Sequence, residues 1–262
     1  MTDIRRLKVC LNGQRARGDH PGLPTDPAGL ARAAEEAVAA GAEAVHLHPR
    51  DATGRESLTS EDVGAAVAAV RAACPGTSVG VSTGLWITGG DPRARRAAVA
   101  GWAGLDDAAR PDVASANVSE PGWSQLVAAL HAAGIGVEAG VWSVADARAL
   151  AEFRPGDRLT RILVEITTGP ADTALDRADG ILAELDRTAA PEPRLLHGED
   201  DACWPLVAHA GSLGLPSRIG LEDTLAGPYG QAVTGNGELV RLGLAAWRSA
   251  APRPSGRPPA HG

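Results

Sequence analysis

The sequence predicts a single (β/α)8 barrel, in which eight parallel strands alternate with eight helices. Three observations support this prediction. Short apolar runs typical of β-strands recur along the chain, each is followed by an Ala- and Leu-rich stretch with helical periodicity, and eight such units follow one another without a break in composition. At 262 residues, parallel strands joined by helices close most economically into one barrel. An open, doubly wound sheet is the alternative.

Runs rich in Val, Leu and Ile define the predicted strands. In chain order they are LKVCL (7–11), AVHLH (44–48), SVGVS (78–82), DVASANV (112–118), IGVEAG (135–140), RILVEI (161–166), RLLHG (194–198) and SRIGLED (217–223).

Helix signals separate these runs. In DPAGLARAAEEAVAAG, Asp26 is the expected N-cap, Pro27 the first helical residue and Gly41 the stop. TSEDVGAAVAAVRAACPG repeats this pattern, with Glu61 and Asp62 in the first turn and a Pro-Gly pair at its end. The same alternation continues along the chain, as a barrel requires.

The two irregular segments are the first loop and the carboxyl-terminal tail. NGQRARGDHPGLPT is long and polar, so we expect it to cover the mouth of the barrel. SAAPRPSGRPPAHG is rich in Pro, Gly and Arg and cannot continue a helix. We therefore expect one catalytic barrel over residues 1–249 and a disordered tail over residues 250–262.

Composition and charge narrow the classes of function. Apolar residues make up 44% of the chain and charged residues 22%, as in globular enzymes. The formal net charge of −7 argues against nucleic-acid or membrane partners, which need clustered Lys and Arg. Three cysteines without CxxC spacing indicate reduced thiols. With no signal peptide or long apolar segment, we expect a cytoplasmic protein.

Two of the seven histidines, His46 and His48, lie one residue apart in the apolar run GAEAVHLHPRD. Residues two apart on a strand point to the same face, which at the carboxyl end of a barrel strand is the interior. Burying two imidazoles there is costly unless something binds them, as a divalent metal would. Two hydrogen-bonded core histidines are the alternative, but the position favours a metal site.

A catalytic zinc needs a third protein ligand, which is often a carboxylate. Glu222, in SRIGLEDT at the end of the eighth strand, is the best candidate. Its neighbour Asp223 would project differently and could act as a base, while Arg218 could bind an anionic group. Capping of the next helix is the alternative role for Asp223.

Polar side chains at other strand ends point to the same mouth. Hydroxyl, amide and carboxyl groups suit a small, oxygen-rich substrate. Ser82 could also be a turn-capping hydroxyl, and Glu138 could orient a histidine from behind. The candidates are Ser82, Thr83, Asn117, Ser119 and Glu138, with Glu165 and His197 as secondary candidates.

Several of these segments together resemble one family. HLH followed by RD and GRESL, the VSTG turn, and RIGLED with GNGELV downstream are similar to motifs of the β-keto acid cleavage enzyme family, which is 3-keto-5-aminohexanoate cleavage enzyme-like. The resemblance runs from about residue 7 to 245, and HxH is specific only together with RxGxED. Family members are zinc-dependent (β/α)8 barrels that react a 3-keto acid with acetyl-CoA, giving acetoacetate and a new acyl-CoA.

The resemblance implies a role for each matching residue. His46, His48 and Glu222 would bind Zn²⁺, and Asp223 would be the base acting on the keto acid, with Arg218 beside it.

Two further matches concern the substrate. Ser82 would help to hold the substrate carboxylate, and Glu138 matches a family glutamate that takes part in the reaction. Active members carry a glutamate in the loop after the first strand, where this chain has Asn12, Gly13, Gln14 and Arg15. We therefore expect Gln14 and Arg15 to set the choice of keto acid, away from a distal ammonium group.

Two other functions remain open. An amidohydrolase-type zinc hydrolase also begins from HxH, but it needs histidines at strands five and six, where this chain has Glu138 and Glu165. The altered first loop also leaves open a non-catalytic barrel that binds metal or carboxylates. Barrels of this kind commonly assemble, so we expect a homo-oligomer.

Overall fold

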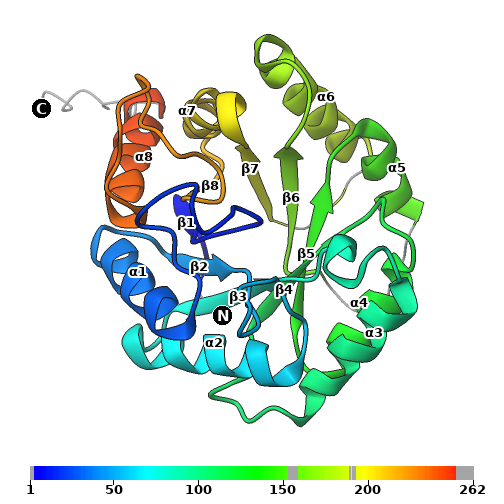
Figure 1. Cartoon of the computed structure of the whole chain (residues 1–262). Helices are drawn as coiled ribbons and strands as arrows, with labels where there is room; N and C mark the ends of the chain where they lie inside the picture. The colour runs from blue at the N-terminus through cyan, green and yellow to red at the C-terminus, as the bar shows by residue number, and fades with distance from the viewer. Residues whose placement is uncertain (1–2, 153–158, 189, 191–192, 252–262) are drawn as a thin grey trace, which may run out of the picture.

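The chain folds into the predicted barrel in a computed structural model, which describes residues 3–152, 159–188, 190 and 193–251. Strands surround the centre and helices lie around the outside (Figure 1). Residues 252–262 of the predicted tail lie outside the described part, and residue 250 ends the last helix, one residue beyond the predicted boundary. Among the described residues, no helix is long and apolar enough to span a membrane.

All eight strands are parallel and form one sheet in the order β7-β6-β5-β4-β3-β2-β1-β8. Between its two edges, the backbone N–H of Leu196 donates to the carbonyl of Pro216 at 3.0 Å, so the barrel is nearly closed. The strands are β1 (Leu7–Cys10), β2 (Ala44–Leu47), β3 (Ser78–Ser82), β4 (Val113–Asn117), β5 (Gly136–Val141), β6 (Arg161–Ile166), β7 (Arg194–Gly198) and β8 (Ser217–Ile219).

A helix follows each strand. The α-helices are α1 (Pro27–Ala39), α2 (Ser60–Ala73), α3 (Pro92–Gly101), α4 (Trp123–Ala132), α5 (Val144–Glu152), α6 (Ala174–Arg187), α7 (Cys203–Leu213) and α8 (Asn236–Ala250). Short 3-10 helices are η1 (Leu85–Thr88), η2 (Trp102–Gly104), η3 (Ala171–Thr173) and η4 (Asp200–Ala202).

Local sequence signals set the first helix as expected. The Asp26 carboxylate accepts a hydrogen bond from the backbone N–H of Gly29 at 2.8 Å, and Pro27 is the first residue of α1. Gly41, just beyond the helix, has a φ of +111° that other residues rarely adopt. The three cysteines are buried and free, as predicted.

The eighth strand is shorter than predicted. It ends at Ile219, and the backbone N–H groups of Asp223 and Thr224 both donate to the Gly220 carbonyl, at 2.9 and 3.0 Å. Glu222 and Asp223 therefore lie in a turn, where strand alternation does not set their directions. The turn needs glycine at position 220, because a Cβ there would lie 1.9 Å from the carbonyl oxygen of Cys10.

Candidate metal centre and active site

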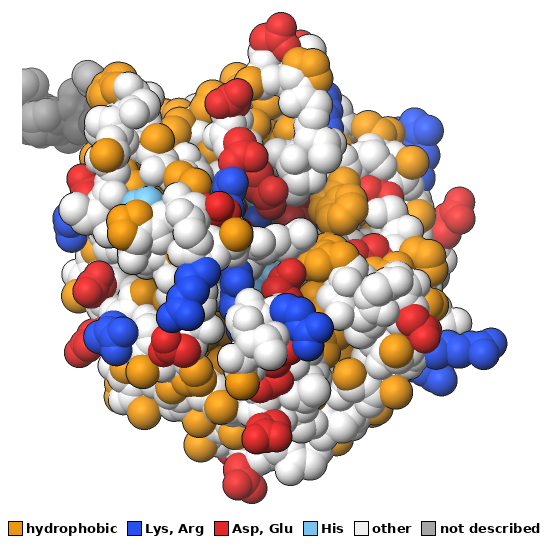
Figure 2. All heavy atoms as spheres, viewed as in Figure 1, with side chains coloured by type: hydrophobic (Ala, Val, Ile, Leu, Met, Phe, Trp, Pro, Cys, Tyr) orange, Lys and Arg blue, Asp and Glu red, His pale blue; other side chains and the backbone are white. Residues whose placement is uncertain are grey.

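A cavity of about 570 Å³ opens at the carboxyl ends of the strands. Figure 2 shows acidic and basic side chains gathered around the hollow at the centre of this face. The first loop contributes to the wall, as predicted. The cavity is lined by Gln14, Arg15, Asp19, His46, His48, Ser82, Trp86, Ser115, Asn117, Trp142, Glu165, Thr167, Thr168, Arg177, Glu199, Asp200, Arg218 and Glu222.

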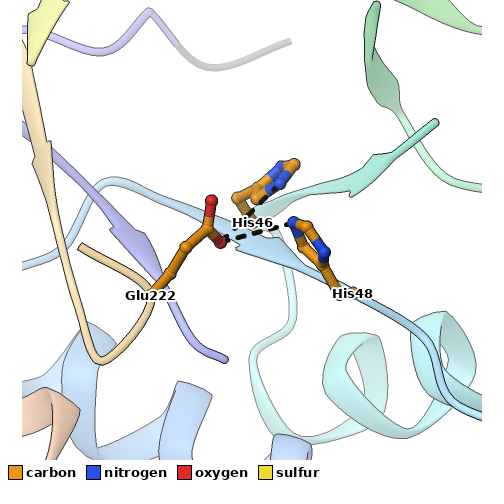
Figure 3. A group of neighbouring side chains, drawn as sticks. All are labelled: His46, His48 and Glu222. Carbon is orange, nitrogen blue, oxygen red and sulfur yellow. Dashed lines mark ion pairs between the residues drawn. The ribbon is translucent and has the colours of Figure 1, made fainter. Parts of the chain in front are cut away.

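The predicted metal ligands come together in this cavity (Figure 3). Glu222 Oε2 lies 3.9 Å from His46 Nε2 and 3.5 Å from His48 Nε2. Two ligand atoms on a tetrahedral zinc are about 3.4 Å apart, so this spacing fits an ion after small shifts. Glu222 Oε2 is buried and has no hydrogen-bond partner among the described residues. An unpaired carboxylate oxygen that faces two imidazole nitrogens fits a divalent cation.

The electrostatics of His46 and Glu222 suit metal ligands, whereas His48 would have to release a proton when a cation binds. Burial lowers the pKa of His46 well below its ordinary value, which keeps the metal-binding neutral form. Burial also lowers the pKa of His48, but the carboxylates of Glu222 and Glu56 overcome this and raise it to about 9. Burial opposes ionisation of Glu222, yet Arg218 and the two histidines hold its pKa well below the ordinary value.

His48 is held in place by residues that sequence reasoning did not assign to the site. Its Nδ1 contacts Glu56 Oε1, and Trp86 Nε1 donates to Glu56 Oε2 at 3.0 Å. The Trp86 ring stacks on His48, with ring centres 6.4 Å apart. The Asn12 side chain exchanges two hydrogen bonds of 2.9 Å with the His48 backbone. Histidine ligands commonly have such a carboxylate partner on the second ring nitrogen.

Arg218 lies among three carboxylates beside the proposed ligands. It contacts Glu222 Oε1 at 2.9 Å, Asp223 Oδ1 at 2.8 Å and Glu199 Oε1 at 3.1 Å. We expected the Asp223 side chain to face the substrate from the side. Instead, Asp223 is 0% exposed and does not line the cavity. The turn that replaces the end of the strand explains this difference. Burial raises the pKa of Asp223, and Arg218 opposes that shift.

The predicted residues at the ends of β3 and β4 divide into two groups. Ser82 and Asn117 line the cavity, where Ser82 Oγ accepts from Gly84 N at 3.2 Å. Thr83 is fully buried, does not line the cavity, and donates its hydroxyl to the Ser115 carbonyl at 2.5 Å. The Thr83 side chain thus ties β3 to β4, and its role in substrate binding stays a prediction.

Glu138 was placed wrongly at the end of its strand. It is the third residue of β5, 0% exposed, and its two oxygens contact Lys8 Nζ at 2.7 Å and Arg161 Nη1 at 2.9 Å. Burial would raise its pKa, but these two cations lower it to about 2. Glu138 lies outside the cavity lining, so it has no direct contact with a substrate there.

The first loop provides Gln14 and Arg15 to the cavity wall, but Arg15 is not a free cation. Its guanidinium contacts Asp200 and donates to the Glu222 carbonyl at 3.3 Å. Arg15 therefore ties the loop to the turn that carries the proposed metal ligand.

Other lining residues follow strands directly and could have been found by applying the strand-end rule to every strand. Trp142 follows β5, Thr167 and Thr168 follow β6, and Glu199 follows β7. The strand-end rule does not find Glu56, because it lies in a loop and reaches His48 only in the folded chain; the signal for it was its place in the GRESL segment.

Comparisons with known proteins agree with this fold and point to one family. A family model described as beta-keto acid cleavage enzyme matches residues 6–255. The complex of ObcA with oxaloacetate is 19% identical, with a TM-score of 0.65 over 85% of this chain and 63% of ObcA. The ternary complex of ObcA with a C4-CoA adduct and oxalate is 21% identical, with a TM-score of 0.64 over 85% and 63%.

A second fold neighbour is 3-dehydroquinate dehydratase from Geobacillus kaustophilus HTA426. It is 11% identical, with a TM-score of 0.56 over 94% of this chain and 91% of that chain. At these identities the structural likenesses establish the fold alone. The chain spans less than two thirds of the length of the ObcA chains.

Proposed function

The chain belongs to the beta-keto acid cleavage enzyme family, and we propose that it reacts a 3-keto acid with acetyl-CoA, giving acetoacetate and a new acyl-CoA. One observation carries the site assignment. The buried Glu222 Oε2, without a hydrogen-bond partner among the described residues, faces the Nε2 atoms of His46 and His48 inside the mouth cavity. We assign these three residues to Zn²⁺, which suits a nitrogen and oxygen ligand set.

A divalent cation at this position would supply Lewis-acid stabilisation of a developing enolate oxygen. The protein's own groups bind and orient the rest of the substrate. The Ser82 hydroxyl and the Asn117 amide line the cavity and can donate to substrate oxygens, and the Arg218 guanidinium reaches the cavity wall as a further donor. Asp223 stays in this proposal as a buried partner of Arg218, for which the resemblance implies the role of base.

The substrate classes draw support from two sources. ObcA has been seen with oxaloacetate and with a C4-CoA adduct, which supports a keto acid and a CoA thioester here. The distal end of the keto acid would meet Gln14 and Arg177, whose guanidinium contacts the Thr168 carbonyl. A neutral amide and a cation favour a neutral or anionic distal group over an ammonium group.

The test is a screen of 3-keto acids with acetyl-CoA and the purified full chain, with acetoacetate as the measured product. We expect acetoacetate and a new acyl-CoA in equal amounts from at least one neutral or anionic keto acid, and neither product from His46→Ala. Metal-loaded protein that forms no acetoacetate from any member of the panel would favour a non-catalytic binding barrel. No histidine follows β5 or β6 in the described chain, so nothing there favours the hydrolase. Homo-oligomer formation stays a prediction.

A further inference from the structure

Arg177 is a cation at the cavity wall that has no carboxylate partner among the described residues. It is the fourth residue of α6, is half-buried and lines the cavity. The other arginines of the described cavity wall, Arg15 and Arg218, are both in ion pairs with carboxylates. Arg177 contacts the backbone carbonyl of Thr168 instead. It can therefore bind an incoming anion without first breaking an ion pair.

The turn after β6 holds the Arg177 guanidinium by one nitrogen. Nη1 donates to the Thr168 carbonyl, and a Cβ on Gly169 would lie 2.5 Å from the same nitrogen. Gly169 also has a φ of +83°, which favours glycine. The turn thus lets the guanidinium pack against it and leaves the N–H groups on Nε and Nη2 for another ligand. These two donors lie side by side, as the two oxygens of a carboxylate require.

Arg177 lies across the cavity from the proposed metal ligands. His46 is on β2 and His48 directly follows it, whereas α6 follows β6. The strands run around the barrel in sequence order, so β6 is four strands from β2 in either direction, on the opposite side (Figure 1). A keto acid that places its reacting end at the metal site would extend its distal end toward Arg177.

The groups around Arg177 also suit an anion. Thr167 and Thr168 follow β6 and line the same part of the cavity, and their hydroxyls can donate to a carboxylate. The nearest acid on β6 is Glu165, with 8% of its side chain exposed. Burial raises the pKa of Glu165 to about 7, so much of it is protonated and uncharged at neutral pH. Its charge therefore cancels only part of the charge of Arg177.

We propose that Arg177 binds a second carboxylate at the distal end of the keto acid, so that this chain prefers 3-keto dicarboxylic acids to keto acids with an uncharged distal end. The proposal rests on the proposed function above and narrows its substrate class. A distal carboxylate gains charge-assisted hydrogen bonds from the guanidinium, which a methyl group cannot replace. The new acyl-CoA would then carry a free carboxylate.

The test compares two keto acids of equal length, 3-oxohexanedioate and 3-oxohexanoate, which differ only in a terminal carboxylate or methyl group. The full metal-loaded chain is assayed with acetyl-CoA, and acetoacetate formation gives kcat/KM for each acid. We expect the wild type to favour the dicarboxylate by about 10- to 100-fold, the usual size for hydrogen bonds between charged groups. Arg177→Gln should lose most of this preference, and Arg177→Lys, which keeps the charge, should retain part of it.

Arg93→Gln is the matched control. Arg93 is an exposed arginine in the first turn of α3, outside the cavity lining, so its replacement should leave the preference unchanged. Equal kcat/KM values for the two acids in the wild type would overturn the proposal, as would an undiminished preference in Arg177→Gln. Acetoacetate formed from both acids in these cases would leave the proposed function intact.

A phosphate group of CoA is the other anion that Arg177 could meet, and a second thioester separates the two. Acetylpantetheine offers the same thioester without the phosphates that lie beyond pantetheine in CoA. If Arg177 binds the keto acid, Arg177→Gln should lose the preference for the dicarboxylate with either thioester. A loss that is equal for both keto acids and disappears with acetylpantetheine would assign Arg177 to CoA and overturn the proposal.

Calorimetric titration of the two keto acids without acetyl-CoA separates this proposal from the proposed function. The metal-loaded wild type should bind 3-oxohexanedioate more tightly than 3-oxohexanoate, and Arg177→Gln should bind both alike. This result in a protein that forms no acetoacetate would keep the Arg177 site and remove the proposed function. Equal binding of the two acids by the wild type, or binding of neither, would overturn the Arg177 site.

Discussion

Charged side chains are buried at both ends of the barrel, but their partners differ. The floor, around Lys8, Glu138 and Arg161, lies below the mouth, where the cavity opens at the carboxyl ends of the strands. On the floor, Glu138 uses one oxygen for Lys8 at 2.7 Å and the other for Arg161 at 2.9 Å. In the mouth, Glu222 Oε2 and both ring nitrogens of His197 are buried without a hydrogen-bond partner among the described residues. Both oxygens of the floor carboxylate thus have a partner, whereas a carboxylate oxygen and two imidazole nitrogens in the mouth lack one.

This difference separates stability from function. A buried charge is costly to desolvate, and partners on all its atoms offset the cost. Glu138 meets that condition through protein groups alone. The mouth does not, which is expected where a cation and a substrate complete the coordination. The buried carboxylate oxygens that lack a partner among the described residues belong to Glu222 and Asp223, both in the turn after β8 at the mouth.

The largest expected effect tests whether the mouth is completed by a metal. Replacement of His46 by Ala removes one of three converging ligand atoms, so the metal content should fall from about one ion per chain to near zero. Elemental analysis of purified protein measures this. His209→Ala, on α7, is the matched control and should keep its metal. Undiminished zinc in His46→Ala would contradict the assignment.

On the floor, replacement of Glu138 by Gln should lower the free energy of unfolding by about 3 kcal/mol near neutral pH. The folded pKa of about 2 lies below the ordinary 4.5, so the ionised group stabilises the fold above pH 4.5. That contribution is lost as the pH falls toward 2. Urea unfolding at pH 7 measures the difference, and equal stability of wild type and variant would show that the floor pairs contribute nothing.

In the mouth, replacement of Glu165 by Gln should raise the free energy of unfolding, opposite to the effect of Glu138→Gln. Its folded pKa of about 7 lies above 4.5, so the fold is favoured by the protonated form and loses that stabilisation as the pH rises through 7. Gln removes the buried charge. At pH 8, with a chelator present, we expect Glu165→Gln to be about 1 to 3 kcal/mol more stable than the wild type. A less stable variant would mean that Glu165 is a structural acid like Glu138.

The smallest expected effect is a change in metal affinity when Glu56, which contacts the second ring nitrogen of His48, is replaced. Glu56→Gln keeps the shape but loses the charge that faces His48 Nδ1, so metal affinity should weaken by about 10- to 100-fold. Competition with a chelator of known affinity measures this change. Glu61→Gln is the control for an exposed glutamate. Unchanged affinity would make Glu56 a partner of Trp86 alone.

Local sequence patterns predicted the fold and the two histidines of the proposed metal site. Strand and helix periodicity and the Asp26 cap are properties of neighbouring residues, so the sequence alone predicts the eight units and their order. His46 and His48 share a face for the same local reason, and the cavity contains both.

The roles of the acids depended on tertiary structure. Glu138 and Glu165 both sit in predicted strands, yet one lies on the floor and the other in the mouth, because each strand's position along the barrel is set by its pairing with the next strand. Asp223 turned inward because the eighth strand ends at Ile219 against the Cys10 carbonyl, a contact between opposite ends of the chain. Alternation along a strand is a local property, whereas strand register and turn geometry arise from contacts between distant segments.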